Sequence, residues 1–205
     1  MSYIKNDTSI PCKVILVGDS GVGKTSIINR YLDTFDPNEK TTIGASFSSK
    51  ITIIDGYKIS FDIWDTAGEE RFRSVNSIFY KEAYVCLIVY DITKENTFQS
   101  IKKFWYNSVK ENANKELTFG IAGNKIDLYS KEEVNEKEVK EFCKEINALF
   151  FKTSAKENTF IDEIFIGLGK KFIHSDNFKS LKPKYIDNDN SIKIKANKNT
   201  KKNCC

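Results

Sequence analysis

Apolar runs of strand length and apolar patterns of helical period alternate along most of the 205-residue chain. Residues 13–17 (KVILV) form a continuous apolar run that stops at Gly18, and a helical pattern opens after Lys24. Residues 51–65 alternate in polarity around an Asp-Gly dipeptide at 55–56, which tolerates positive φ and favours a two-residue hairpin turn. We therefore expect a strand, a glycine loop and a helix, followed by two antiparallel strands.

The rest of the chain continues this alternation. Apolar runs predict strands at 85–90, 117–123 and 150–153, and apolar residues at helical spacing predict helices around 98–105, at 135–147 and around 160–172. Strands that are apolar on both faces and alternate with helices are typical of a parallel sheet covered on both sides. We expect an α/β fold, with a mostly parallel six-stranded sheet, one antiparallel hairpin strand, helices on both faces and ligands at the carboxyl ends of strands.

The net charge of +4 is concentrated near the C-terminus. Residues 175–205 contain eight Lys and three Asp, whereas residues 1–174 carry 24 basic and 25 acidic side chains. Residues 175–205 are also rich in Asn and poor in aromatic residues, so they cannot bury enough apolar surface to offset the entropy of ordering. We expect a flexible segment at 1–10, one folded domain at 11–174 and a disordered tail at 175–205.

The five cysteines have no spacing typical of a disulfide framework, which favours a reducing, cytosolic setting. The apolar runs, of which 85–90 is among the longest, fall far short of the roughly 20 residues that a membrane-spanning helix needs. The sequence therefore predicts a domain that does not cross a bilayer.

Residues 18–25 (GDSGVGKT) match the phosphate-binding pattern G-x-x-x-x-G-K-[ST], and they lie between a predicted strand and a predicted helix, as this motif requires. Glycines let successive backbone N–H groups converge on phosphates, and the helix N-terminus adds partial positive charge. Lys24 supplies a full charge to the β- and γ-phosphates, and Thr25 offers its hydroxyl to Mg²⁺. The neighbouring loop residues that we expect at the nucleotide are Ser20, Gly21, Val22, Gly23 and Ser26.

Three further loops complete the predicted site. Asp65 ends a strand where it can reach Mg²⁺, and Gly68 leaves a bare N–H near the γ-phosphate. Asn124-Lys125-Ile126-Asp127 follows the strand at 117–123; the carboxylate of Asp127 can accept hydrogen bonds from guanine N1–H and the 2-amino group, which adenine lacks. The loop that we expect to close over the base consists of Ser154, Ala155 and Lys156. These residues predict selection of guanine.

With these motifs, the chain resembles the Rab family of small GTPases over about residues 10–174 and again at its C-terminus. Further segments that carry the resemblance are IGASF (43–47), IWDTAG (63–68), RFRSV (71–75), FYKEA (79–83) and IVYDIT (88–93). TTIGASF at 41–47 is similar to the endosomal branch of that family. The resemblance implies a P-loop NTPase fold of the small G domain type, with bound GTP or GDP and Mg²⁺.

The resemblance also implies roles for particular residues. Thr42 would bind Mg²⁺ and the γ-phosphate, and Phe35 would pack on the guanine. Phe47, Trp64 and Tyr80 would form an aromatic patch that effectors contact, although all three also suit half-buried positions in a sheet. The implied partners are an exchange factor, an activating protein, effectors, a prenylation escort and a GDP-dissociation inhibitor, and no nucleic acid.

Glu69 departs from the family, which usually has Gln at this position to orient the attacking water. With Lys24 and Gly68 it completes the predicted catalytic set. An ionised Glu69 can only accept hydrogen bonds; it could take a proton from water, yet its charge opposes that of the γ-phosphate. We therefore expect slow hydrolysis that responds weakly to an activating protein. Alternatively, Glu69 points to solvent, and Glu70 or Arg71 matters more.

Smaller departures and alternatives remain. Ser20 is interpreted first as a tolerated loop residue, and Lys81-Glu82 stands where the family commonly has a basic residue and Gly, which leaves partner choice open. A nearly hydrolysis-deficient GTP-bound scaffold is the main alternative function. A metabolic P-loop kinase is disfavoured because no second-substrate site is evident.

Cys204 and Cys205 match the Cys-Cys ending that many Rab proteins use for two geranylgeranyl groups. Two lipid chains, with Lys198, Lys201 and Lys202 near anionic lipid, would form a stable anchor, whereas one chain binds marginally. The sequence thus predicts a GTPase switch on the cytosolic face of an intracellular membrane, expected to be endosomal, that also cycles through the cytosol.

Overall fold

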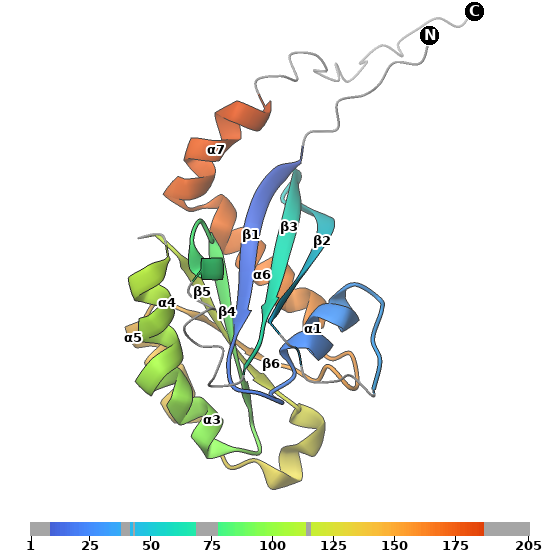
Figure 1. Ribbon diagram of the computed structural model, residues 1–205, viewed down its shortest axis with the longest axis vertical. Coiled ribbons are helices and arrows are strands. Elements are labelled where there is room, and N and C mark those ends of the chain that lie inside the picture. The colour runs from blue at the N-terminus through green and yellow to red at the C-terminus, as the bar shows by residue number, and fades with distance from the viewer. Residues whose placement is uncertain (1–8, 38–41, 43, 69–77, 114–115, 187–205) are drawn as a thin grey trace, which may run out of the picture.

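The computed structural model describes residues 9–37, 42, 44–68, 78–113 and 116–186. It contains a six-stranded sheet in the order β2-β3-β1-β4-β5-β6, shown in Figure 1. β2 pairs antiparallel with β3, and the other neighbouring strands pair in parallel. The strands are β1 (Ile10–Val17), β2 (Ala45–Ile54), β3 (Tyr57–Thr66), β4 (Val85–Asp91), β5 (Thr118–Asn124) and β6 (Leu149–Lys152). The predicted fold class is confirmed.

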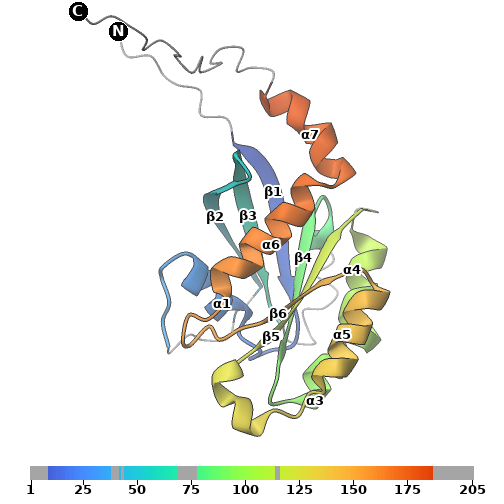
Figure 2. The same ribbon diagram turned by 180° about the vertical axis from the view of Figure 1, so that it is seen from behind.

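Helices cover both faces of this sheet (Figures 1 and 2). The elements are α1 (Lys24–Tyr31), α3 (Glu95–Ser100), the π-helical η2 (Ile101–Trp105), α4 (Tyr106–Asn112), the 3₁₀-helical η3 (Ile126–Lys131), α5 (Glu136–Glu145), α6 (Ile161–Ile173) and α7 (Asp176–Ile186). Among the described residues, no helix is long and apolar enough to cross a membrane.

The alternation of side chains along β4 explains why two cores form. Val85, Leu87 and Val89 are buried in the core with α1, α6 and α7, whereas Cys86 and Ile88 are buried in the core with α3, η2, α4 and α5. A strand that is buried on both faces must be apolar at every position, as the run at 85–90 is. The helix layers therefore fix the sheet, and its carboxyl edge is left for ligands.

The hairpin is present as predicted, with Ile54 paired to Tyr57 and the turn residues Asp55 and Gly56 at φ 47° and 85°. β2, however, begins at Ala45, six residues before the predicted start. The prediction missed its first residues because they lack an apolar pattern, and on this edge strand Phe47, Ile51 and Ile53 all face solvent. The last core helix begins after Phe160, which is exposed.

Residues 176–186 correct the predicted tail. They form α7, and Phe178 is buried against Tyr57 and Phe172, with ring centroids 5.1 and 5.6 Å apart. Lys182 Nζ also donates to Tyr57 Oη at 2.9 Å. A tail that starts at 175 is therefore wrong for these eleven residues, because buried Phe178 and partly buried Leu181 anchor this helix to the core.

Candidate functional site

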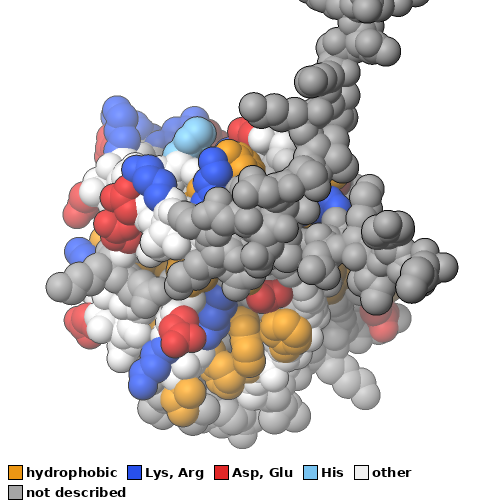
Figure 3. Space-filling model, turned by 90° about the horizontal axis from the view of Figure 1, so that it is seen from above, with side chains coloured by type: hydrophobic (Ala, Val, Ile, Leu, Met, Phe, Trp, Pro, Cys, Tyr) orange, Lys and Arg blue, Asp and Glu red, His pale blue; other side chains and the backbone are white. Residues whose placement is uncertain are grey.

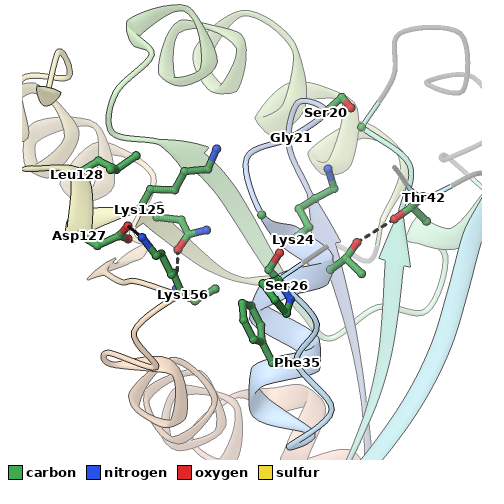
Figure 4. A pocket seen from close by; sticks show the side chains of 16 residues that line it. Ser20, Gly21, Lys24, Ser26, Phe35, Thr42, Lys125, Asp127, Leu128 and Lys156 are labelled. Carbon is green, nitrogen blue, oxygen red and sulfur yellow. Dashed lines mark hydrogen bonds and ion pairs between the residues drawn. The ribbon is translucent and has the colours of Figure 1, made fainter. Parts of the chain in front are cut away.

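A cavity of about 460 Å³ lies where the carboxyl ends of the parallel strands meet, and loops from distant parts of the chain line it (Figure 4). Fourteen of the seventeen predicted nucleotide-binding residues line it, together with Pro37 and Leu128, which sequence reasoning missed. Those fourteen are Ser20, Gly21, Gly23, Lys24, Thr25, Ser26, Phe35, Thr42, Gly68, Asn124, Lys125, Asp127, Ala155 and Lys156. Val22, Asp65 and Ser154 contact lining residues through hydrogen bonds.

The glycines of the loop after β1 are required by its close contacts. Gly18 has φ 141°, and a Cβ there would lie 2.2 Å from the carbonyl oxygen of Val89. Gly23 has φ 98° and precedes α1; a Cβ there would lie 2.3 Å from Asn124 Nδ2. Side chains at these positions would push the loop away from the sheet edge, so the loop keeps its path only with glycine.

Lys24 is a buried cation, with 6% of its surface exposed. Its Nζ donates to the carbonyl oxygens of Gly18 at 2.8 Å and Asp19 at 3.0 Å. Burial lowers the pKa of Lys24 to about 8, although Asp65 and Asp19 raise it. The ammonium group is thus held by carbonyls of the phosphate loop and is poorly solvated, which increases its attraction for an anionic ligand.

Three oxygen atoms from separate segments converge beside Lys24. Thr25 Oγ1 lies 2.5 Å from Asp65 Oδ2 and 2.8 Å from Thr42 Oγ1, and Thr42 Oγ1 lies 3.2 Å from the same carboxylate oxygen. Asp65 is buried at the end region of β3, with 2% of its surface exposed. Two hydroxyls and one carboxylate form a set of hard oxygen ligands, which Mg²⁺ prefers.

Gly68 places bare backbone against the phosphate loop. A Cβ at Gly68 would lie 2.5 Å from Lys24 Nζ and 2.5 Å from the Ser20 backbone nitrogen. Any other residue would have to displace one of these groups. The segment after β3 and the loop after β1 therefore meet at the ammonium group of Lys24.

The residues predicted to recognise the base also lie together. Asp127 is in η3, with 7% of its side chain exposed, and its Oδ1 accepts a hydrogen bond from Ser154 Oγ at 2.6 Å. Lys156 Nζ lies 4.0 Å from Asp127 Oδ2. Figure 4 shows Asp127 and Lys156 at the opposite end of the cavity from Ser20 and Gly21. One end of the cavity thus carries a carboxylate, and the other carries backbone amides.

Two neighbouring polar side chains at the end of β5, Asn124 and Lys125, hold the segments around the cavity together. Asn124 Oδ1 accepts from the backbone N–H of Ala155 at 3.1 Å, and Asn124 Nδ2 donates to the carbonyl oxygen of Val22 at 2.9 Å. Lys125 Nζ lies 2.7 Å from Oδ2 of buried Asp91. Burial raises the pKa of Asp91, but hydrogen bonds from Lys125 and Thr93 lower it by more, so the pKa lies below its usual value.

Arg30 supports the side of the cavity, a role that sequence reasoning missed. Its guanidinium carbon lies 3.6 Å from the ring centroid of Phe35. The same group donates to the carbonyl oxygens of Ala155 at 2.8 Å and Lys156 at 2.7 Å. A half-buried Arg on α1 has no motif signal, because its partners lie about 125 residues away in sequence.

The predicted aromatic patch requires a correction. Phe47 is 56% exposed and its ring centroid lies 5.3 Å from that of Trp64, as expected of neighbours on β2 and β3. Tyr80 is fully buried, so it cannot contribute to a surface. Phe79 lies beside Trp64 instead, with ring centroids 5.4 Å apart. We therefore define the aromatic patch as Phe47, Trp64 and Phe79.

Several predicted residues cannot be placed. Glu69, its alternatives Glu70 and Arg71, and the C-terminal residues Lys198, Lys201, Lys202, Cys204 and Cys205 lie outside the described residues. Within the described part of the chain, no group of three or more His, Cys, Asp and Glu side chains could hold a metal ion. The hydroxyl and carboxylate oxygens of Thr25, Thr42 and Asp65 are therefore the best candidate for a cation there.

Comparison with known proteins agrees with this arrangement. Residues 13–174 match the model of the Ras family. The chain is 42% identical to "Ras-related protein RabJ" of Dictyostelium discoideum, over 83% of this chain and 68% of that protein. It is 43% identical to human "Ras-related protein Rab-22A" over 80% and 84% of the two chains, and 40% identical to human "Ras-related protein Rab-31" over 94% and 96%.

Proposed function

Because the chain belongs to the Rab GTPases of the Ras family, we propose that it is a membrane-anchored switch that binds GTP and GDP, hydrolyses GTP, and recruits effectors in vesicle traffic. The observation that carries this proposal is the shared cavity of Lys24, the oxygen cluster and Asp127. The phosphates would lie on the loop at 18–25, and the guanine would lie against Asp127.

Guanine selectivity follows from the buried carboxylate of Asp127. With one oxygen already accepting from Ser154, its remaining acceptor capacity suits the N1–H and 2-amino donors of guanine. Adenine has no such pair of donors and would leave a buried charge poorly compensated.

The cluster of Thr25, Thr42 and Asp65 fits Mg²⁺ in ligand chemistry. These residues would hold the ion, which would neutralise charge on the β- and γ-phosphate oxygens. Thr42 lies on the segment before β2 and Gly68 on the segment after β3, so both can respond to the presence of a γ-phosphate. Release of that phosphate would free both segments and end effector binding.

For hydrolysis, we assign positioning and charge stabilisation to Lys24 and the backbone of Gly68, and orientation of the attacking water to Glu69. An ionised carboxylate cannot donate to the transferring phosphoryl group, as an amide can. Intrinsic hydrolysis is therefore slow, and Glu69 weakens stimulation by an activating protein that relies on Gln. Single-turnover hydrolysis by the native chain and by Glu69→Gln, each with and without such a protein, tests this assignment; equal stimulation of both contradicts it.

A nearly hydrolysis-deficient scaffold is the second candidate, and the Glu at position 69 is the observation that favours it. The hydrolysis rate separates the two functions. The full chain is purified, its bound nucleotide is identified, and the conversion of GTP is followed with Mg²⁺. Conversion within hours supports the switch, and GTP that persists for days supports the scaffold. Equal uptake of ATP and GTP contradicts both.

We assign effector contact to the aromatic patch of Phe47, Trp64 and Phe79. The exchange factor, activating protein, prenylation escort and GDP-dissociation inhibitor are partners expected of this family. Binding assays with a GTP-selective effector should show loss of binding in Phe79→Ala and normal binding in Ile53→Ala, an exposed position farther along β2. Equal loss in both variants would place the contact elsewhere.

The membrane anchor is assigned to two prenyl groups on Cys204 and Cys205, with support from Lys198, Lys201 and Lys202. Figure 3 views the end that carries α7, where acidic and basic side chains are mixed over the described surface. Attraction to anionic lipid is therefore assigned to the lysines after residue 186. Mass spectrometry of the native protein should detect two prenyl additions, and an unmodified Cys-Cys pair contradicts the anchor.

The compartment that we propose is endosomal, with cycling through the cytosol. The similarity of residues 41–47 (TTIGASF) to the endosomal branch of the family supports this assignment. Imaging of the tagged chain against endosomal and Golgi markers tests it, and exclusive Golgi labelling contradicts it.

A further inference from the structure

Trp105 and Asp19 connect a helix layer to the phosphate loop across 86 positions of sequence. Trp105 is fully buried at the end of η2, and its indole Nε1–H donates to Asp19 Oδ1 at 2.8 Å. A hydrogen bond to an ionised acceptor is about twice as strong as one between neutral groups. The buried indole thus provides a directed restraint on one residue of the phosphate loop.

Trp105 lies in an irregular turn of its helical segment. α3 and α4 are joined by the π-helical η2, where the Tyr106 N–H donates to the carbonyl oxygen of Ile101, five residues earlier. Single π turns inside α-helices occur frequently at functional sites. Phe98 and Ile101 pack the helical segment that precedes Trp105 into the core, so the turn that presents Trp105 is held rigidly.

Asp19 also contacts the catalytic side of the loop through its backbone. Its carbonyl oxygen accepts from Lys24 Nζ at 3.0 Å, and a Cβ on Gly68 would lie 2.5 Å from its carbonyl carbon. The peptide between Asp19 and Ser20 is therefore the surface against which both Lys24 and Gly68 pack. A shift of this peptide would move both groups.

The charge of Asp19 makes its direction important. Ser20 and Gly21 line the cavity, whereas Asp19 is not among its lining residues. A carboxylate turned toward the cavity would repel phosphates, because like charges at close range in a partly buried site are strongly destabilising. The bond to Trp105 turns that carboxylate toward the helix layer.

We propose that Trp105 is a positioning residue for the phosphate loop: its indole N–H holds the Asp19 carboxylate away from the cavity and fixes the Asp19–Ser20 peptide that supports Lys24 and Gly68. This role rests on the proposed nucleotide binding, and it assigns η2 a part in slowing dissociation of the nucleotide. Trp105 acts through Asp19 and does not contact the ligand.

The test measures dissociation of fluorescently labelled GDP from the full chain with Mg²⁺. Trp105→Phe keeps most of the packing and removes the donor, and Asp19→Ala removes the acceptor at a half-buried position. Each change is expected to speed dissociation by about 5- to 20-fold. This range corresponds to the loss of part of the free energy of one charge-assisted hydrogen bond. The double variant should be no faster than the faster single variant within about twofold.

Two controls separate positioning from general loss of stability. Val109→Ala removes buried volume from α4 on the same packed segment and should leave GDP dissociation within about twofold of native. Asp19→Asn keeps an acceptor oxygen and should restore dissociation to within about threefold of native. The proposal is overturned if Trp105→Phe matches Val109→Ala, or if the two single effects multiply in the double variant. A native chain that retained no GDP would instead overturn nucleotide binding, and this role with it.

Discussion

Asn124 Nδ2 donates a 2.9 Å hydrogen bond to the carbonyl oxygen of Val22, so the end of β5 is tied directly to the phosphate loop. Asn124 is buried, with 2% of its surface exposed, and its Oδ1 accepts from the Ala155 N–H. One side chain thus holds three loops of the cavity in a common position. The base end and the phosphate end of the site are therefore mechanically linked even before a ligand spans them.

Asn124→Ala should weaken both the fold and nucleotide binding. The change leaves buried backbone groups of Val22 and Ala155 without this partner, at about 1–3 kcal/mol for each group. We expect a loss of about 2–4 kcal/mol in the free energy of unfolding, measured by urea titration, and weaker GDP binding by calorimetry.

Asn135→Ala is the matched control for this change. Asn135 caps α5 by accepting from the Lys137 N–H and does not line the cavity. Loss of this cap should cost about 1 kcal/mol and leave GDP affinity unchanged. Normal stability in Asn124→Ala would contradict a structural link through its side chain.

Binding of nucleotide should take up protons near pH 8. The pKa of Lys24 is about 8 in the free protein because burial disfavours its charge, and adjacent phosphates should raise it again. Affinity should therefore be constant well below pH 8 and fall as the pH rises above it, since Lys24 must then gain a proton on binding. Calorimetry in buffers of different ionisation enthalpy should give about half a proton per GDP at pH 8 and almost none at pH 6.5.

Lys24→Arg is the control, because a guanidinium stays protonated throughout this range. Proton uptake should disappear in that variant. Persistent uptake would assign the titration to another group.

Asp127→Asn should change the base preference of the site from guanine to xanthine. An amide can accept from N1–H and donate to the 2-oxo group of xanthine, but it cannot accept from two guanine donors as the carboxylate does. We expect GTP affinity to fall by about 10²- to 10⁴-fold, with xanthosine triphosphate preferred, in competition binding. Ser154→Ala, which removes one donor to Asp127, should cost at most about tenfold and keep the guanine preference.

Glu82→Gly should stabilise the domain. Glu82 is exposed and has φ 60°, a left-handed conformation that costs a non-glycine residue about 1–2 kcal/mol. Allowing for the greater chain entropy of glycine, we expect a gain of about 1 kcal/mol in urea unfolding. Glu82→Ala removes the same charge but keeps the Cβ, so a similar gain in that variant would attribute the effect to charge instead of backbone.

Phe178→Ala should detach α7. Phe178 is 3% exposed and packs between Tyr57 and Phe172. We expect a loss of about 2–4 kcal/mol in unfolding free energy and faster proteolysis within 176–186. Lys179→Ala changes only an exposed pair with Asp176 and should have little effect on either measurement. Unchanged proteolysis in Phe178→Ala would contradict docking through this ring.

The sequence predicts most of this fold because parallel strands that are buried on both faces are apolar over most of their length, as residues 85–90 of β4 and 119–123 of β5 are. The phosphate and base motifs predict the cavity for a related reason: parallel strands bring their following loops to one edge.

Asp19, Arg30 and Trp105 could not be predicted, since their partners lie far away in sequence and no spacing rule connects them. Tyr80 and Phe79 are adjacent aromatics, and only packing decides which one is buried. The signal for α7 was Phe178 with Leu181 three positions later, within a segment whose overall composition favours disorder.

The docking of α7 also determines how many residues separate the folded domain from a lipid attached near Cys205. If the chain left the domain at residue 175, thirty residues would separate it from Cys205, with a maximum reach of roughly 100 Å. Because α7 extends to Ile186, nineteen residues remain, and their maximum reach is roughly 65 Å. α7 itself is held beside the β2–β3 turn, since Lys182 Nζ donates a hydrogen bond to Tyr57 Oη. A lipid-bound molecule would accordingly search a smaller volume above its bilayer, and partners held close to the same surface would meet it more often.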